Sequence, residues 1–182
     1  MGKLLKRLCI TLLVLLVLAG GGAWWLLSYI KPDKPLDLQY RPIDVGHKAM
    51  EMIHSFKPEL VLTEPEVNDL IKKHLKRDIA KNVLLDGAEF QLEGDRLLAD
   101  LNITYRDRIP AEVKVEYRME WQEPNLVLKP ESLHLKGIGL PTSMIDTLSI
   151  PLELPTGELV SVENVNFEND AIKVLFKIKL EF

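Results

Sequence analysis

Apolar residues follow one another without a charge over residues 8–30, near the start of the chain. A helix rises 1.5 Å per residue, so this run would be about 34 Å long, enough to cross a hydrocarbon core of about 30 Å. Positive charges before such a run keep that end in the cytoplasm, and aromatic rings at the far end prefer the headgroup layer. The run is preceded by Lys3, Lys6 and Arg7, and it ends with Trp24, Trp25 and Tyr29 close together. The pattern predicts a single-pass anchor in the cell membrane, with residues 1–7 as a cytoplasmic tail.

A cleaved signal peptide is the alternative interpretation of this run. Gly21, Gly22 and Ala23 form the kind of small-residue pattern at which signal peptides are cut. The apolar stretch continues beyond that pattern as far as Ile30, which favours a retained signal anchor. Both interpretations place residues 31–182 outside the cytoplasm.

Residues 31–42 contain two prolines and several charges, and this composition predicts an extended stalk or linker. The folded extracytoplasmic domain is expected over residues 43–182.

Two segments of that domain have the periodicity of a helix. Residues 43–56 have a loose apolar face, and a clearer helix is predicted over 64–80, after a brief strand at 60–62. Thr63 and Glu66 form a capping box, in which the hydroxyl and the carboxylate satisfy amides at the start of the second helix. Its apolar face is formed at helical spacing by Val67, Leu70, Ile71, Leu75 and Ile79.

From Ala88 onward the period of the apolar residues changes to two, which is typical of strands. The alternating segments are 88–93, 97–105, 111–122, 126–135 and 172–182. A bend is expected at Pro130, a short helix at 142–148, and a hairpin that starts at Gly157 and turns at Asn169-Asp170. Strict alternation gives a sheet one wet and one dry face, and the dry face must be covered. We therefore expect an α+β domain in which a curved antiparallel sheet of five or six strands wraps on one or two helices.

Composition narrows the function classes. Of 182 residues, 47% are hydrophobic and 27% are charged, which fits one folded domain rather than a disordered chain. The single cysteine excludes an internal disulfide framework and a thiolate-rich zinc site. The formal net charge is −4, and residues 31–182 alone carry −7, which argues against a nucleic-acid partner.

No catalytic motif stands out in the chain, such as a nucleophile elbow, HExxH or paired CxxC. His47, Glu51 and His54 share one face of the first predicted helix, but scattered polar residues on a solvated face explain them better than a metal site. We therefore expect no enzyme, no metal and no cofactor.

The dry face of the sheet is the first candidate site. In one interpretation it is a closed core, and in the other it lines a cavity or groove that takes an acyl chain. Both interpretations need the same residues, so the sequence leaves them open. The ligand-facing candidates are Leu70, Ile71, Leu101, Ile103, Val113, Val115, Tyr117, Met119, Val174, Phe176 and Ile178.

A cationic stretch along the second predicted helix is the other candidate site. Lipid headgroups or an anionic envelope polymer would be attracted to it. The plainer interpretation is a solvated helix face whose cations favour the helix C-terminus. The candidate contacts are Lys72, Lys73, Lys76 and Arg77, with Lys81 following.

The order of several short motifs resembles a known family. These are Leu62–Ile71 after the membrane segment, then Leu92–Asp95, Ile109–Ala111, Gly139–Pro141 and Met144–Asp146, before a final alternating strand. The chain resembles the YpmS-like family of uncharacterised single-pass membrane proteins of Gram-positive bacteria. More distantly, it is similar to one half of a tubular lipid-binding fold. That resemblance implies lipid or envelope-precursor binding, and it supplies no catalytic residues.

The anchor, the one-sided sheet and the resemblance together predict a membrane-anchored extracytoplasmic binding protein for a lipid or other apolar envelope component. The alternative is a structural or interaction module of a cell-envelope assembly without a small-molecule ligand. Such a module would contact another envelope protein through a sheet edge or through the helix at 43–56.

Overall fold

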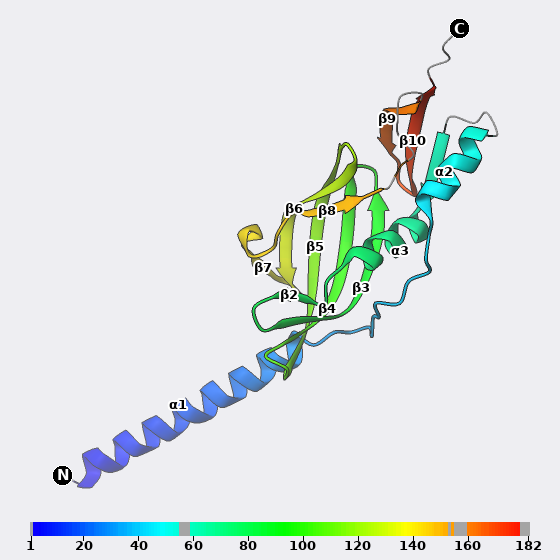
Figure 1. The fold of residues 1–182 in the computed structure, drawn as a ribbon. Coiled ribbons are helices and arrows are strands. Elements are labelled where there is room, and N and C mark those ends of the chain that lie inside the picture. The colour runs from blue at the N-terminus through cyan, green and yellow to red at the C-terminus, as the bar shows by residue number, and fades with distance from the viewer. Residues whose placement is uncertain (1, 55–58, 153, 155–159, 179–182) are drawn as a thin grey trace.

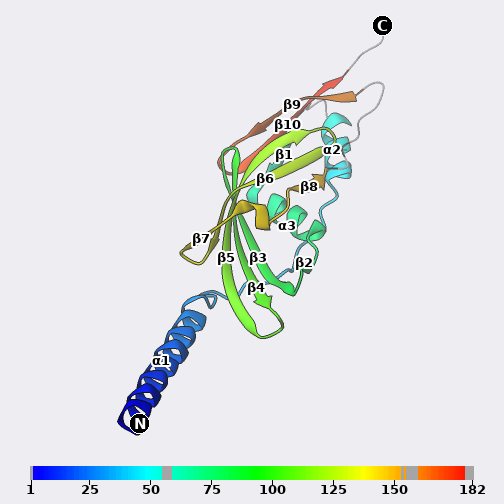
Figure 2. The same cartoon turned by 90° about the vertical axis from the view of Figure 1, so that its left-hand side faces the viewer.

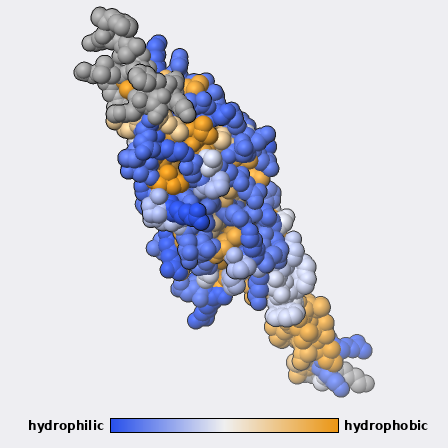
Figure 3. Space-filling view, turned by 90° about the vertical axis from the view of Figure 1, so that its right-hand side faces the viewer, coloured by the Kyte–Doolittle hydropathy of each residue, from blue (hydrophilic) through white to orange (hydrophobic). Residues whose placement is uncertain are grey.

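The computed structural model describes residues 2–54, 59–152, 154 and 160–178. Helix α1 (Gly2–Tyr29) is continuous over 28 residues and projects away from the rest of the molecule (Figure 1). Its segment Leu5–Tyr29 is long and apolar enough to cross a membrane, by length and composition. In the space-filling view α1 is an apolar rod with a charged N-terminal end, set off from a largely polar domain (Figure 3).

Helix α2 (Val45–His54) and strand β1 (Glu59–Thr63) precede α3 (Glu64–His74). Residues 55–58, which include the predicted end of the first helix, lie outside the described residues. The capping box is confirmed, because the backbone amide of Thr63 donates to Oε2 of Glu66 over 2.9 Å. Val67, Leu70 and Ile71 are buried, as the apolar stripe predicts.

The prediction that this helix continues to residue 80 is wrong. Helix α3 ends at His74, and Leu75 is already extended, with φ −70° and ψ 138°. The carbonyl of Arg77 accepts a hydrogen bond from the amide of Leu85, and β2 (Asp78–Ala80) pairs with β3 (Val83–Glu93). Pairing along a sheet edge therefore replaces the last helical turns, and Ile79 is 39% exposed instead of buried.

The larger sheet is antiparallel and has seven strands. Six follow the order β2-β3-β4-β5-β6-β7, and β8 pairs with β6 beside β7. The strands beyond β2 are β3 (Val83–Glu93), β4 (Arg96–Tyr105), β5 (Ile109–Gln122), β6 (Asn125–Leu135), β7 (Ile138–Leu140) and β8 (Leu148–Pro151). The sheet curves strongly, and α3 crosses its concave side (Figures 1 and 2). The α+β class and the curved antiparallel sheet are therefore confirmed.

A second sheet has the order β1-β10-β9, with β9 at Val160–Phe167 and β10 at Ala171–Ile178. The turn between β9 and β10 falls at Asn169 and Asp170 as predicted. The predicted start of this hairpin, Gly157, lies outside the described residues. The sequence did not predict that this hairpin forms a separate sheet. That sheet depends on pairing between β10 and β1, which lies more than a hundred residues earlier in the chain.

Two further predictions concern the edge of the larger sheet. The bend at Pro130 is confirmed by a register shift, since Glu116 pairs with Ser132 while Tyr117 pairs with Pro130. The short helix at 142–148 is wrong. Only a 3-10 turn forms, η1 (Thr142–Met144), after which β8 extends the sheet. The apolar residues of that segment alternate, and Ile150 pairs with Leu126 on β6.

Candidate functional site

The predicted ligand-facing residues do converge on one surface. Nine of the eleven are buried, and Ile103 is half-buried against them. They come from α3, β4, β5 and β10, so the concave face and the smaller sheet enclose a single core. The side chain of Ile178 lies outside the described residues. The sequence pattern therefore predicted correctly which side chains gather, but their gathering alone does not distinguish a core from a ligand site.

The burial of the concave face decreases toward one end of the sheet. Along β4 the exposed fraction rises from 0% at Leu97 to 6% at Leu101, and Ile103 is partly exposed. Along β6 it rises from 0% at Leu126 to 6% at Leu133, and the last residue of that strand is partly exposed. Helix α3 contacts β3, β1 and β10. The less buried end of β4 and β6 is the end nearest α1 (Figures 1 and 2).

Tyr117 lies in the middle of β5 on this face and is only 2% exposed. Its hydroxyl forms no hydrogen bond within the part of the chain that the structure describes. The hydroxyl of Tyr117 is thus without a partner among the described residues, at the end of a buried ring.

Burial also raises the pKa of Tyr117, so the phenol is neutral and remains a hydrogen-bond donor at physiological pH. Buried tyrosine hydroxyls usually find a partner, which makes an unpartnered one an indication of a missing acceptor. The sequence pattern assigned Tyr117 to the apolar wall and did not indicate that its hydroxyl would lack a partner among the described residues. The only indication in the sequence was that one phenol stands among aliphatic residues on the apolar face of this strand.

The predicted cationic helix face does not form. Lys76 and Arg77 lie beyond the end of α3, because the helix stops at His74. Lys72 has a side chain only 10% exposed, with its Nζ 3.8 Å from Oδ1 of Asp37. Lys73 alone is an exposed cation on the helix itself. The expectation that the four share one helix face is therefore wrong, while their contact with a headgroup or an anionic polymer stays a prediction.

The segment predicted as a stalk lies along the convex face of the sheet. The amide of Glu112 donates to the carbonyl of Ile30 over 2.8 Å, and the amide of Ala88 donates to that of Asp37 over 3.1 Å. Between them, Nδ2 of the buried Asn102 donates to the carbonyl of Lys34 over 2.7 Å. We call residues 31–40 the strap, because these bonds fasten the segment across β3, β4 and β5.

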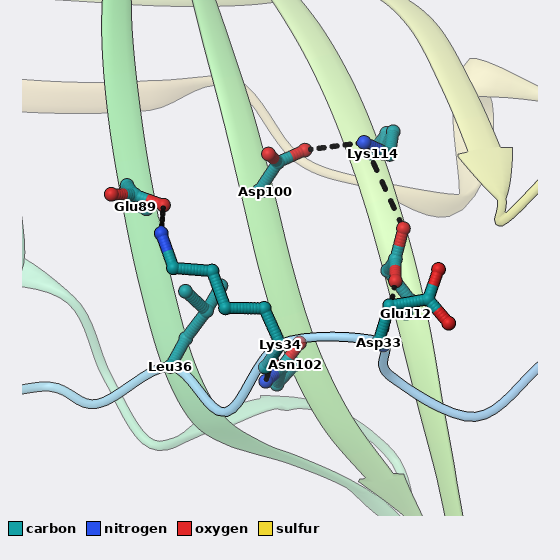
Figure 4. A pocket seen from close by; sticks show the side chains of 8 residues that line it. All are labelled: Asp33, Lys34, Leu36, Glu89, Asp100, Asn102, Glu112 and Lys114. Carbon is teal, nitrogen blue, oxygen red and sulfur yellow. Dashed lines mark hydrogen bonds and ion pairs between the residues drawn. The ribbon is translucent and has the colours of Figure 1, made fainter.

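A pocket of about 170 Å³ opens between the strap and these strands (Figure 4). Its lining is polar and mutually paired: Lys34 lies 2.7 Å from Glu89, and Lys114 lies 3.2 Å from Asp100. The hydrogen bond to Asp100 raises the pKa of Lys114, which keeps that amine charged. Because these charged groups already pair with one another, we interpret the pocket as the space left between the strap and the sheet. Among the described residues, no group of three His, Cys, Asp or Glu side chains is placed to hold a metal ion.

Comparison of the chain with protein-family models, with curated proteins and with solved structures finds no match. The resemblance to the YpmS-like family and to a tubular lipid-binding fold therefore stays a prediction.

Proposed function

We propose that the chain is a membrane-anchored, extracytoplasmic binding protein whose concave face takes the apolar part of a lipid. The carrying observation is Tyr117, a buried phenol whose hydroxyl is unpartnered within the described residues. A lipid supplies what this environment lacks, an oxygen acceptor attached to an apolar chain. An ester carbonyl or a hydroxyl of the ligand would accept the hydrogen bond from Tyr117.

The burial gradient supports an entry path. The apolar wall loosens along β4 and β6 toward Ile103 and Leu135, at the end of the sheet nearest α1. An acyl chain leaving a bilayer in which α1 is embedded would meet this end first. Binding requires no covalent step, so we propose a carrier or receptor role rather than an enzyme.

The proposed orientation rests on α1 and its flanks. Lys3, Lys6 and Arg7 precede the apolar span, and such charges favour the cytoplasmic side. At the other end, Ile30 is 7% exposed and its carbonyl is bonded to the domain. Contact between the helix end and the domain supports a retained anchor over a cleaved signal peptide.

Native mass spectrometry of the full chain, released from detergent micelles, tests this function. We expect a population carrying one lipid, whose mass identifies the ligand class. Tyr117→Phe should lower the lipid-bound fraction severalfold, because the donor is lost while the ring remains. Tyr40→Phe, on the exposed Tyr40, is the matched control and should leave that fraction unchanged.

Lipid held only around α1 would be retained equally by both variants, and that outcome would contradict the proposal. A lipid-free mass after incubation with mixed phospholipids would contradict it as well. Either result would favour the alternative function, a structural or interaction module of an envelope assembly.

A further inference from the structure

We infer that the end of the domain beside α1 docks on anionic phospholipid headgroups. The surface consists of Lys81 in the β2–β3 turn and Arg106 and Arg108 in the β4–β5 loop, and we call it the basic tip. It lies outside the concave face, so it is a membrane-surface contact separate from the proposed ligand site.

Backbone hydrogen bonds hold the basic tip in a defined conformation. The amide of Arg106 donates to the carbonyl of Asn82 over 2.8 Å, which joins the loop to the neighbouring turn. The amide of Arg108 donates to the carbonyl of Tyr105 over 3.2 Å and closes the loop on itself. Asn82 and Arg106 have positive φ values of 61° and 50°, as tight turns require. The three cations are therefore held on one small surface.

No ion pair among the described residues neutralises the three cations of the basic tip, and they outnumber the one carboxylate of the loop, Asp107. Lys81, Arg106 and Arg108 are exposed, and none of them forms an ion pair with another described residue. Cations on the convex face behave differently, since Lys114 and Arg118, for example, each pair with two carboxylates. Residues 31–182 carry a net charge of −7, so an unpaired cationic surface stands out against the acidic domain.

The position of α1 identifies the partner. The carbonyl of Ile30, one residue beyond α1, bonds to the amide of Glu112 near the start of β5. The β4–β5 loop precedes that point directly, and both views place it at the end of the domain nearest α1 (Figures 1 and 2). When α1 spans a bilayer, the loop consequently lies at the level of the headgroups.

The neighbouring side chains also suit a headgroup layer. Tyr105 is 36% exposed, and the guanidinium carbon of Arg106 lies 5.2 Å from its ring centroid. Trp24 and Trp25 are exposed near the end of α1. Aromatic rings beside arginine and lysine are typical of membrane–water interfaces, and anionic headgroups attract cations there.

The test uses the full chain in lipid nanodiscs. Cys9 is the only cysteine, so Cys9→Ser with Pro110→Cys places one environment-sensitive fluorophore beside the loop, at an exposed uncharged position. We expect the emission to shift to shorter wavelength in discs with 30% phosphatidylglycerol relative to pure phosphatidylcholine. Raising the salt concentration to 0.5 M should reverse the shift, because screening weakens exposed charge contacts.

Arg106→Gln with Arg108→Gln should weaken docking by roughly fivefold per charge removed. Lys129→Gln with Lys177→Gln is the matched control, with equal loss of charge elsewhere on the domain. An identical spectrum in both disc types would overturn the inference, as would a shift retained by the arginine variant or lost in the control. Lipid retention in native mass spectrometry should not change in the arginine variant, so the docking surface and the proposed ligand site can fail separately.

Discussion

The hydroxyl of Tyr117 lies at the end of a side chain that is almost wholly removed from water. Ionising it would place a charge among aliphatic groups, which is why burial raises its pKa. In the unfolded chain the same phenol ionises near pH 10, as an ordinary tyrosine does. The folded and unfolded states therefore bind different numbers of protons in alkaline solution.

This difference predicts an alkaline loss of stability. Above about pH 10 the unfolded state releases a proton that the folded state keeps, so the free energy of unfolding falls as pH rises. Below about pH 9 the phenol is neutral in both states and causes no pH dependence. Urea denaturation in detergent micelles between pH 8 and 11.5 should show this decrease. Tyr117→Phe should flatten it and Tyr40→Phe should not; parallel curves for both variants would contradict the assignment.

At the scale of the element, α3 is fastened mainly at its start. Glu66 accepts from the amide of Thr63 over 2.9 Å and lies 2.6 Å from Nζ of Lys48, which also donates to the carbonyl of Val61. Burial alone would raise the pKa of Glu66, but the hydrogen bonds from Lys48 and Thr63 outweigh it and lower that pKa. The carboxylate consequently joins α2, β1 and α3.

Glu66→Gln should therefore lower the free energy of unfolding by about 1–2 kcal/mol at pH 7. A lowered pKa means that the stabilisation is complete above the pKa of an unfolded glutamate, about 4.3, and is lost as pH falls through the folded value. The difference between variant and wild type should thus narrow as pH falls below about 4.3. Glu93→Gln, at an exposed carboxylate of β3, serves as the control and should cost less than about 0.5 kcal/mol.

The two ends of α3 show what the sequence determines locally. Its start was predictable because Thr63 and Glu66 form a capping box within four residues. Its end was not, because Leu75 and Ile79 fit the spacing of a helix as well as that of a turn and an edge strand. The choice depends on the β3 backbone, whose Leu85 amide bonds to the Arg77 carbonyl. The cations at 76 and 77 were placed on the helix for the same reason, and they lie beyond its end.

At the scale of the molecule, the strap joins α1 to the sheet. It crosses β3 at Gly87, where an added Cβ would lie 2.2 Å from the carbonyl carbon and oxygen of Leu36. Both of these are backbone atoms, so no side chain can move aside to relieve the contact. A glycine at this position allows the strap to lie directly on the strand.

Gly87→Ala should lift the strap and destabilise the domain by about 1–3 kcal/mol, as overpacking does. Hydrogen exchange of the Ala88 amide should accelerate, since this amide donates to the carbonyl of Asp37. In Gly139→Ala the added Cβ would meet nothing closer than 3.9 Å, so that variant should keep slow exchange at Ala88. Unchanged exchange in Gly87→Ala would show that the strap is not fastened at this point.

The contacts of the strap could not be predicted from the spacing of apolar and polar residues. Its prolines and charges predicted an extended segment, and the alternating charges of the strands predicted a solvated face. The structure brings the two together through Lys34 with Glu89 and Asn102 with the strap backbone. Such a contact produces no periodic pattern in the sequence, because its partners are more than fifty residues apart. The concave face and its curvature followed from periodicity, whereas the lack of a described partner for the Tyr117 hydroxyl depends on three-dimensional packing.

The hydrogen bond between Ile30, just after α1, and Glu112 on β5 has a mechanical consequence. A helix of this length adapts to bilayer thickness by tilting, and the flexible linker of an ordinary anchor would absorb that motion. Here the helix end is bonded to the sheet, so in the proposed anchored state the domain should tilt together with the helix. Bilayer thickness would thereby set how steeply the sheet stands over the membrane, and a thicker or thinner membrane would present a different edge of the same protein.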